Sequence, residues 1–107
     1  MIETSLTQDA LWIGEMRGID VEGERLLVVR HDDGVCVFRD RCPHQGYPLS
    51  EGRLEAGVIT CRVHQHTFDA ASGDGINPPR PCLTKLSARV EAGQILVELS
   101  PSRKALP

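Results

Sequence analysis

The segment that decides the fold runs from residue 42 to residue 64 and reads CPHQGYPLSEGRLEAGVITCRVH. It begins with a Cys-x-His group, Cys42 and His44. After sixteen intervening residues it ends with a Cys-x-x-His group, Cys61 and His64. Each group pairs a thiolate with an imidazole, whereas a zinc finger usually follows a cysteine pair with a histidine pair. This mixed pairing suits a dinuclear iron centre in which two cysteines bind one iron and two histidines bind the other.

The pattern resembles the signature of the Rieske family, in which a Cys-x-His group, a spacer and a Cys-x-x-His group hold a [2Fe-2S] cluster. The match extends to Gly46, to Phe68 and Asp69, and to the loop at residues 75–79, which contains two prolines. In the family this loop covers the cluster. The resemblance therefore implies one Rieske-type [2Fe-2S] cluster per chain.

The resemblance also assigns the ligands. It places Cys42 and Cys61 on the inner iron. It places His44 and His64 on the outer iron, bound through ring nitrogens, with the edges of both rings facing solvent. No residue is assigned a catalytic role.

Both ends of the chain are predicted to form β-strands separated by turns, the pattern of a sandwich or barrel. The expected strands are residues 15–21, 25–30, 35–38, 85–91 and 94–99. In the fourth of these, Leu86, Ala88 and Val90 share one face. A short helical turn is expected at residues 8–12, with Ser5 and Thr7 as candidate N-caps.

Residues 40–81 differ from the ends, because they hold five of the seven prolines and five of the ten glycines. Apart from strand fragments at residues 58–60 and 67–68, most of this segment is expected to be loop. Ordering one residue costs about 1 to 2 kcal/mol of backbone entropy, so a bound metal centre is the expected organiser. We therefore predict an all-β Rieske iron-sulfur fold. Residues 1–39 and 82–107 form an antiparallel sandwich or barrel base, and residues 40–81 form a cluster-binding subdomain.

Length and charge exclude several functional classes. A chain of 107 residues makes one domain and is short for an enzyme. The net charge of -3, with no basic stripe, argues against a nucleic-acid partner. No apolar stretch approaches the roughly 20 residues that cross a membrane. The first residues lack the pattern of a secretory signal, so we expect a cytoplasmic protein whose cysteines serve as metal ligands.

Two departures from the high-potential Rieske proteins predict a low reduction potential. Those proteins join their ligand loops by a disulfide, and the matching positions here are Tyr47 and Val63. They also donate hydrogen bonds to the cluster from a serine and a tyrosine, where this chain has His66 and Phe68. Hydrogen-bond donors stabilise the more negative reduced state, so their loss lowers the potential.

Residues 11–16, 57–62 and 73–78 are similar to the ferredoxin component of toluene-4-monooxygenase-type aromatic oxygenase systems. This resemblance implies a monomeric one-electron carrier rather than an enzyme. It would pass electrons from a flavin-containing, NADH-dependent reductase to a terminal oxygenase, either an aromatic diiron monooxygenase or a ring-hydroxylating dioxygenase. Docking is expected to be transient and close to His44 and His64. That relative has a tryptophan where this chain has His66, so the partner oxygenase is expected to differ.

Other interpretations stay open at this point. A mononuclear zinc site would use the same four side chains to staple a binding module. A Rieske-like small subunit of a reductase such as nitrite reductase would share the fold. A reactive thiol would use Cys61 as nucleophile and His64 as base. His66 could replace His64 as a ligand, although the spacing favours His64.

Several residues outside the four ligands also carry expectations. His31 is expected in a solvated hairpin turn, and Cys36 and Cys82 are expected to pack as small apolar side chains. Tyr47 is expected to pack over the second ligand loop. Four acidic residues close to the ligands in sequence would, if they ring the cluster, steer docking to a basic partner; they are Glu51, Glu55, Asp69 and Asp74.

Overall fold

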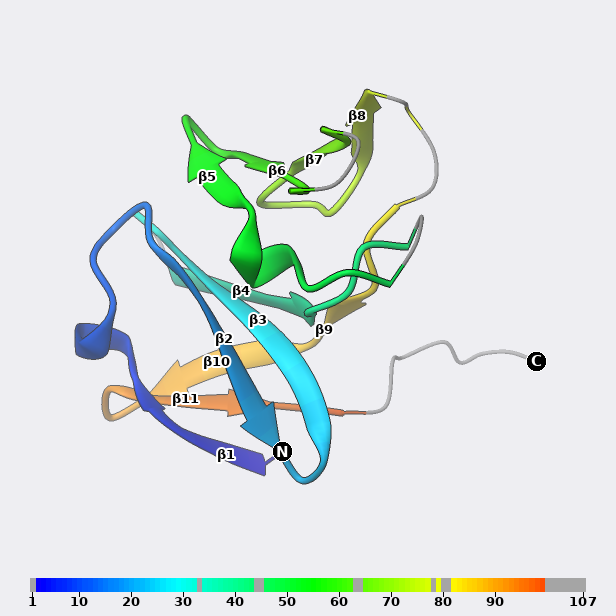
Figure 1. The fold of residues 1–107 in the computed structure, drawn as a ribbon. Coiled ribbons are helices and arrows are strands. Elements are labelled where there is room, and N and C mark those ends of the chain that lie inside the picture. Colours follow the sequence, from blue (N-terminus) through cyan, green and yellow to red (C-terminus); the bar gives the residue numbers. More distant parts are fainter. Residues whose placement is uncertain are drawn as a thin grey trace.

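The computed structural model describes residues 2–32, 34–43, 46–62, 65–77, 79 and 82–99. Within these residues the chain forms antiparallel β-sheets and two short 3-10 helices (Figure 1). The expected all-β architecture is confirmed. The described part of the chain has no helix with the length and apolar character that crossing a membrane requires.

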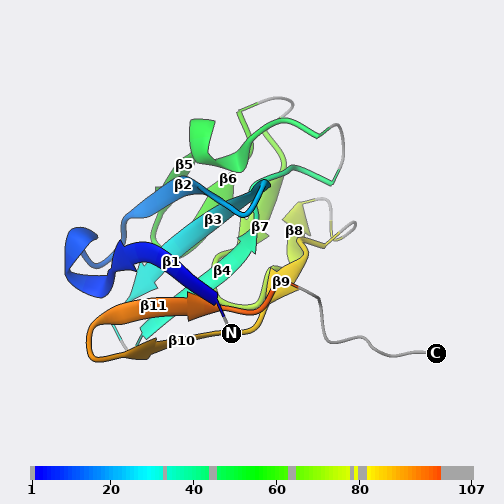
Figure 2. The same ribbon diagram turned by 90° about the horizontal axis from the view of Figure 1, so that it is seen from below.

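The base consists of two sheets that pack face to face. One sheet has the strand order β2 (Met16–Val21), β3 (Glu24–His31), β4 (Gly34–Arg39) and β9 (Lys85–Leu86). The other has the order β1 (Ile2–Thr7), β11 (Gln94–Val97) and β10 (Ala88–Glu91). Figure 2 shows the second sheet lying across the first. Leu26, Val28 and Val37 from the first sheet share a core with Ile95 and Val97 from the second.

A third sheet lies above the base in Figure 1. Its strands, in order, are β5 (Arg53–Glu55), β6 (Val58–Thr60), β7 (Thr67–Asp69) and β8 (Gly75–Asn77). The 3-10 helix η2 (Leu49–Glu51) precedes it, and η1 (Gln8–Ala10) follows β1. The sheet lies within the cluster-binding subdomain predicted for residues 40–81, and the boundaries of that subdomain stay a prediction.

Strand β3 links the base to this upper sheet because both of its faces are buried. Leu26 and Val28 point into the core of the base, whereas Leu27 and Val29 point into a second core. All four side chains are 0% exposed. A strand that is buried on both faces needs a continuous apolar run rather than alternation, which explains the sequence of β3.

The predicted elements differ from the observed ones in three places. The expected strand at residues 85–91 is broken at Ser87, because Leu86 pairs with Val37 on β4 while Ala88 pairs with Val97 on β11. The chain passes from one sheet to the other at this point. The alternation of apolar residues over 85–91 continues through the break and so does not predict it. Strand β1 and the two outer strands β5 and β8 were not predicted, since strands this short or irregular lack clear alternation. The expected helical turn is the 3-10 helix η1.

Candidate metal centre

Two loops carry the predicted cysteine ligands, and each begins just after a strand. Cys42 follows β4, and Cys61 follows β6 directly. An equivalent backbone hydrogen bond closes each loop. The amide of Cys42 donates to the carbonyl of Tyr47 at 2.8 Å, and the amide of Cys61 donates to the carbonyl of His66 at 2.7 Å. Each loop therefore returns to its cysteine after five residues.

The two loops also share a left-handed backbone position four residues after the cysteine. Gly46 has φ 80° and Gln65 has φ 58°. Glycine takes this conformation without steric cost, whereas a residue with a side chain pays about 1 kcal/mol or more. The two loops therefore have the same backbone form, as expected if they bind one cluster together. The predicted ligands His44 and His64 lie outside the described residues, so their roles stay predictions.

Both cysteine side chains are buried in one hydrophobic core. Each is 1% exposed, and the core also contains Leu49, Ile59 and Phe68. Soft thiolates shielded from water suit iron or zinc rather than hard cations. The two cysteines therefore fit the inner iron of a cluster. In the sequence, each cysteine is followed within its loop by one of the predicted histidine ligands.

Asp40 ties the first ligand loop to the base. Its carboxylate is fully buried and accepts from Arg25 Nε at 3.1 Å, from Ser50 Oγ at 2.7 Å and from the Ser50 amide at 2.8 Å. Asp40 precedes Cys42 by two residues, and Ser50 belongs to η2, so these bonds hold the loop at both ends. A side chain at Gly18 would approach Arg25, Asp40 and Ser50 to within 2.7 Å. Sequence reasoning missed Asp40, because its partners are distant along the chain.

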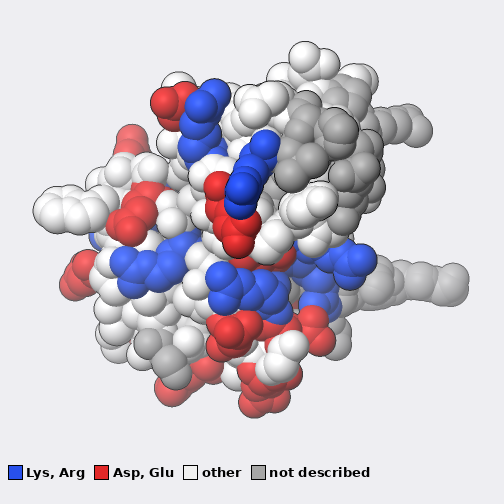
Figure 3. Space-filling view, viewed as in Figure 1, with Lys and Arg blue, Asp and Glu red and all other residues white. Residues whose placement is uncertain are grey.

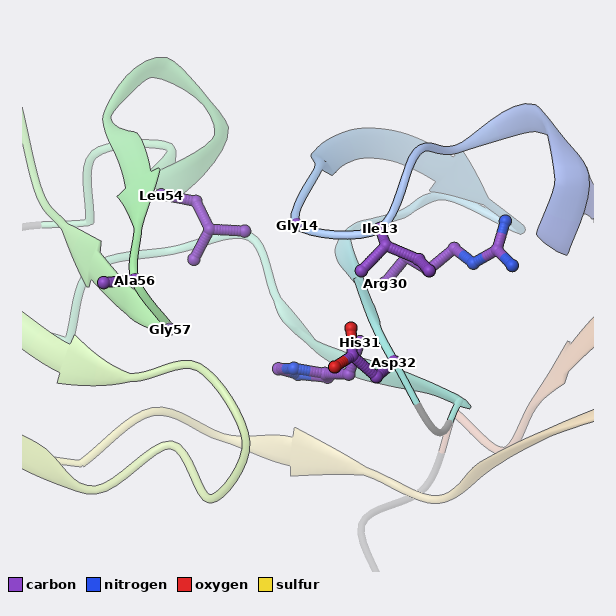
Figure 4. Close-up of a pocket in the computed structure, with 8 residues that line it drawn as sticks. All are labelled: Ile13, Gly14, Arg30, His31, Asp32, Leu54, Ala56 and Gly57. Atoms are coloured by element: carbon purple, nitrogen blue, oxygen red, sulfur yellow. The ribbon is translucent and has the colours of Figure 1, made fainter.

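The turn after β7 is a second connection to the base. His31 Nε2 lies 2.9 Å from the carbonyl of Ala70, and Lys85 Nζ donates to the carbonyl of Ala71 at 2.7 Å. His31 was expected to be solvated in a hairpin turn; it is the last residue of β3 and is partly exposed. His31 also borders a pocket of about 500 Å³ between Ile13 and Leu54 (Figure 4). Neither Cys42 nor Cys61 lines this pocket.

Asp69 begins the same turn and has a lowered pKa. Its Oδ1 accepts from the amides of Ala71 and Ser72 at 2.8 and 3.0 Å. These hydrogen bonds, with Ser72 the larger contributor, and the nearby His31 hold the pKa of Asp69 below its ordinary value of 3.8. The ionised form is favoured because both amides donate to it.

This shift predicts how Asp69 contributes to stability at acid pH. A carboxyl group whose pKa is lowered by folding stabilises the protein fully above its ordinary pKa, and loses that effect as pH falls through the lowered value. Wild type should therefore exceed Asp69→Asn in free energy of unfolding at pH 6, and the difference should shrink below about pH 4. Urea unfolding of both proteins between pH 6 and pH 3 measures it. A difference that is constant over this range would contradict the prediction.

The remaining sequence expectations have mixed outcomes. Cys36 is half-buried and packs against the core that holds the ligand cysteines, as predicted in outline. Cys82 is exposed, so its expected packing role is wrong. Tyr47 is 46% exposed rather than buried over the second loop. His66 is half-buried and contributes its carbonyl to the loop closure.

The described residues place two buried cysteines at the starts of two matched loops, as the predicted metal centre requires. A family model for the Rieske [2Fe-2S] domain matches residues 4–88, and the chain belongs to this family. The ferredoxin component of the alkene monooxygenase system of Xanthobacter autotrophicus is 39% identical over 97 residues, which cover 90% of this chain and 80% of that protein.

Two solved structures are similar over most of the chain. The ferredoxin of carbazole 1,9a-dioxygenase from Nocardioides aromaticivorans has a TM-score of 0.80 and 28% identity, covering 90% of this chain and 94% of that one. A chain in the complex of reduced oxygenase and oxidized ferredoxin in carbazole 1,9a-dioxygenase has a TM-score of 0.79 and 27% identity, covering 89% of this chain and 99% of that one.

Family membership confirms the predicted cofactor, a Rieske [2Fe-2S] cluster, in preference to the zinc alternative. When bound, the cluster supplies a one-electron couple whose potential depends on its ligands and hydrogen bonds. The described residues fit it: they contribute two buried thiols, two matched loops and an apolar shell that keeps water away.

Proposed function

We propose that the chain is a one-electron carrier that serves as the ferredoxin component of an oxygenase system. The observation that carries the proposal is the pair of buried cysteines on two matched loops. The chain that holds them is 39% identical to such a component. A carrier of this kind needs a rigid cluster near its surface and weak docking, so that it can leave after each transfer. Catalysis belongs to the oxygenase.

The finer parts of the proposal concern ligands and partners. Cys42 and Cys61 hold the inner iron, and His44 and His64 hold the outer iron. The electron donor is a flavin-containing, NADH-dependent reductase, and the acceptor is a multicomponent oxygenase acting on aromatic or alkene substrates. The carrier works as a monomer in the cytoplasm. Both cysteines at their expected positions support this function over a Rieske-like nitrite reductase subunit, because many such subunits have lost the ligands.

An electron paramagnetic resonance spectrum of the dithionite-reduced protein tests the cluster type. We expect the low average g value of a histidine-ligated [2Fe-2S] centre, together with equal amounts of iron and acid-labile sulfide. Zinc without sulfide, or the higher average g value of an all-cysteine cluster, would overturn the ligand assignment. Reduction of an oxygenase component by the reduced protein tests the carrier role.

Phe68 offers a direct test of the predicted low potential. Its ring is 1% exposed and shares the core with both ligand cysteines, but it has no hydroxyl to donate. Phe68→Tyr should raise the reduction potential by roughly 40 mV, since a hydrogen bond to the reduced cluster contributes about 1 kcal/mol. Protein-film voltammetry measures the change. Phe68→Leu is the control, because it changes the ring without adding a donor and should leave the potential nearly unchanged.

A further inference from the structure

Directly before the first ligand loop lies an arginine that forms no ion pair with another described residue. Arg41 is exposed and directly precedes Cys42. A Cβ built on Gly46 would lie 3.4 Å from Arg41 Nε, so the guanidinium lies along the outside of the loop. Among the ion pairs between described residues, none includes Arg41. Its charge is therefore available to a partner.

The acidic residues expected to steer docking are mostly engaged within the chain. Glu51 pairs with Arg62 at 3.1 Å, and Glu55 pairs with Arg53 at 3.6 Å. Asp69 accepts two backbone hydrogen bonds in its own turn. Most of the negative charge that was expected to attract a basic partner is therefore paired within the chain. The docking surface of the chain can then be positively charged rather than negatively charged.

A pocket beside the loop contains Arg41 and two further arginines that are paired with carboxylates. It has a volume of about 350 Å³ and is lined by three arginines, by two carboxylates and by Gly46 and Pro48; the charged residues are Arg25, Arg39, Arg41, Glu24 and Asp40. Arg25 is held by Asp40, and Arg39 is held by Glu24 and by the carbonyl of Leu99. Figure 3 shows Lys and Arg side chains in a band across the middle of the molecule, with Asp and Glu side chains both above and below it. The arginine fork is well suited to a carboxylate, because it donates two parallel hydrogen bonds.

We propose that this pocket, the arginine pocket, receives an acidic side chain from the surface of the oxygenase. The carboxylate pairs with Arg41 and places the oxygenase against the loop that carries Cys42. The inference rests on the proposed function and adds the chemistry of the partner to it. An acidic docking face is the reverse of what the acidic residues near the ligands predict, and Arg41 is the residue that determines it.

The test measures electron transfer from the reduced holoprotein to the purified oxygenase component of the Xanthobacter autotrophicus alkene monooxygenase system. Stopped-flow rates at low salt should fall about tenfold in Arg41→Glu, and wild type should slow as salt is added. Arg41→Lys keeps the charge and should retain most of the rate. The matched control is Arg89→Glu on β10, a 59% exposed arginine in the base sheet, which should stay within about twofold of wild type.

A second probe separates failure of the docking site from failure of the proposed function. Fluorescein-labelled hexaglutamate should bind wild type and Arg89→Glu at low salt, and should bind Arg41→Glu several-fold more weakly. Electron transfer that is equal or faster in Arg41→Glu would overturn the docking site while leaving the carrier role intact. Peptide binding that depends on Arg41, with no electron transfer by wild type at any salt, would overturn the carrier role. Iron and acid-labile sulfide contents should be the same in all variants, which excludes a damaged cluster.

Discussion

Replacing Cys42 or Cys61 with serine should remove nearly all of the bound iron and sulfide. Each thiol is 1% exposed and comes from one of two matched loops. A serine hydroxyl stays protonated at neutral pH and cannot replace a thiolate as a soft ligand. Since metal binding contributes directly to folding free energy, both variants should also melt at lower temperature than wild type. Iron and sulfide analysis, with the visible absorption spectrum, measures the loss.

The chain contains its own controls for this prediction. Cys36→Ser and Cys82→Ser change the other two cysteines, one half-buried and one exposed. Both should keep the iron and sulfide content of wild type. Full iron content in Cys42→Ser, or cluster loss in Cys82→Ser, would contradict the ligand assignment made here.

Gly52→Ala should destabilise the protein more than Gly57→Ala in the same hairpin. A Cβ at Gly52 would lie 2.0 Å from the backbone oxygen of Thr60. Backbone cannot move aside as a flexible side chain can, and Arg53 pairs with Thr60 in the β5–β6 hairpin. The overlap should push the strands apart next to Cys61 and cost about 3 kcal/mol or more of unfolding free energy. Urea unfolding of the holoprotein measures the cost.

Gly57→Ala is the matched substitution in the same hairpin. Gly57 has φ 77°, and a Cβ there would meet nothing within 4 Å. Its cost comes only from the left-handed backbone and should be about 1 to 2 kcal/mol. Gly52 lacks a left-handed φ, so its cost is steric. Equal losses in the two variants would show that the close approach to Thr60 is unimportant. Loss of iron in Gly52→Ala but not in Gly57→Ala would show that the hairpin positions Cys61.

Much of the fold is predictable from the sequence, and so are all four residues of the candidate site, of which the two cysteines lie within the described structure. The base strands are visible because Leu26 to Val29 and Ile95 to Val97 are strongly apolar and bounded by turns. The cysteine ligands are visible because their spacing is local. The third sheet is not, since β5 and β8 are three residues long and their pairing depends on neighbours. The break at Ser87 cannot be predicted from the sequence for the same reason, because the residues before and after it pair with strands of two different sheets.

By itself the sequence predicted the cluster, because the Cys-x-His group at Cys42 and the Cys-x-x-His group at Cys61 are patterns of neighbouring residues. Only the tertiary structure decided which charges remain for a partner. Arg25 reaches Asp40, and Glu51 reaches Arg62, across 15 and 11 positions of sequence. Long-range folding brings such groups together and cancels their charge, and it leaves Arg41 beside the first ligand loop. Charge can be counted along a chain, but its balance depends on distances in space.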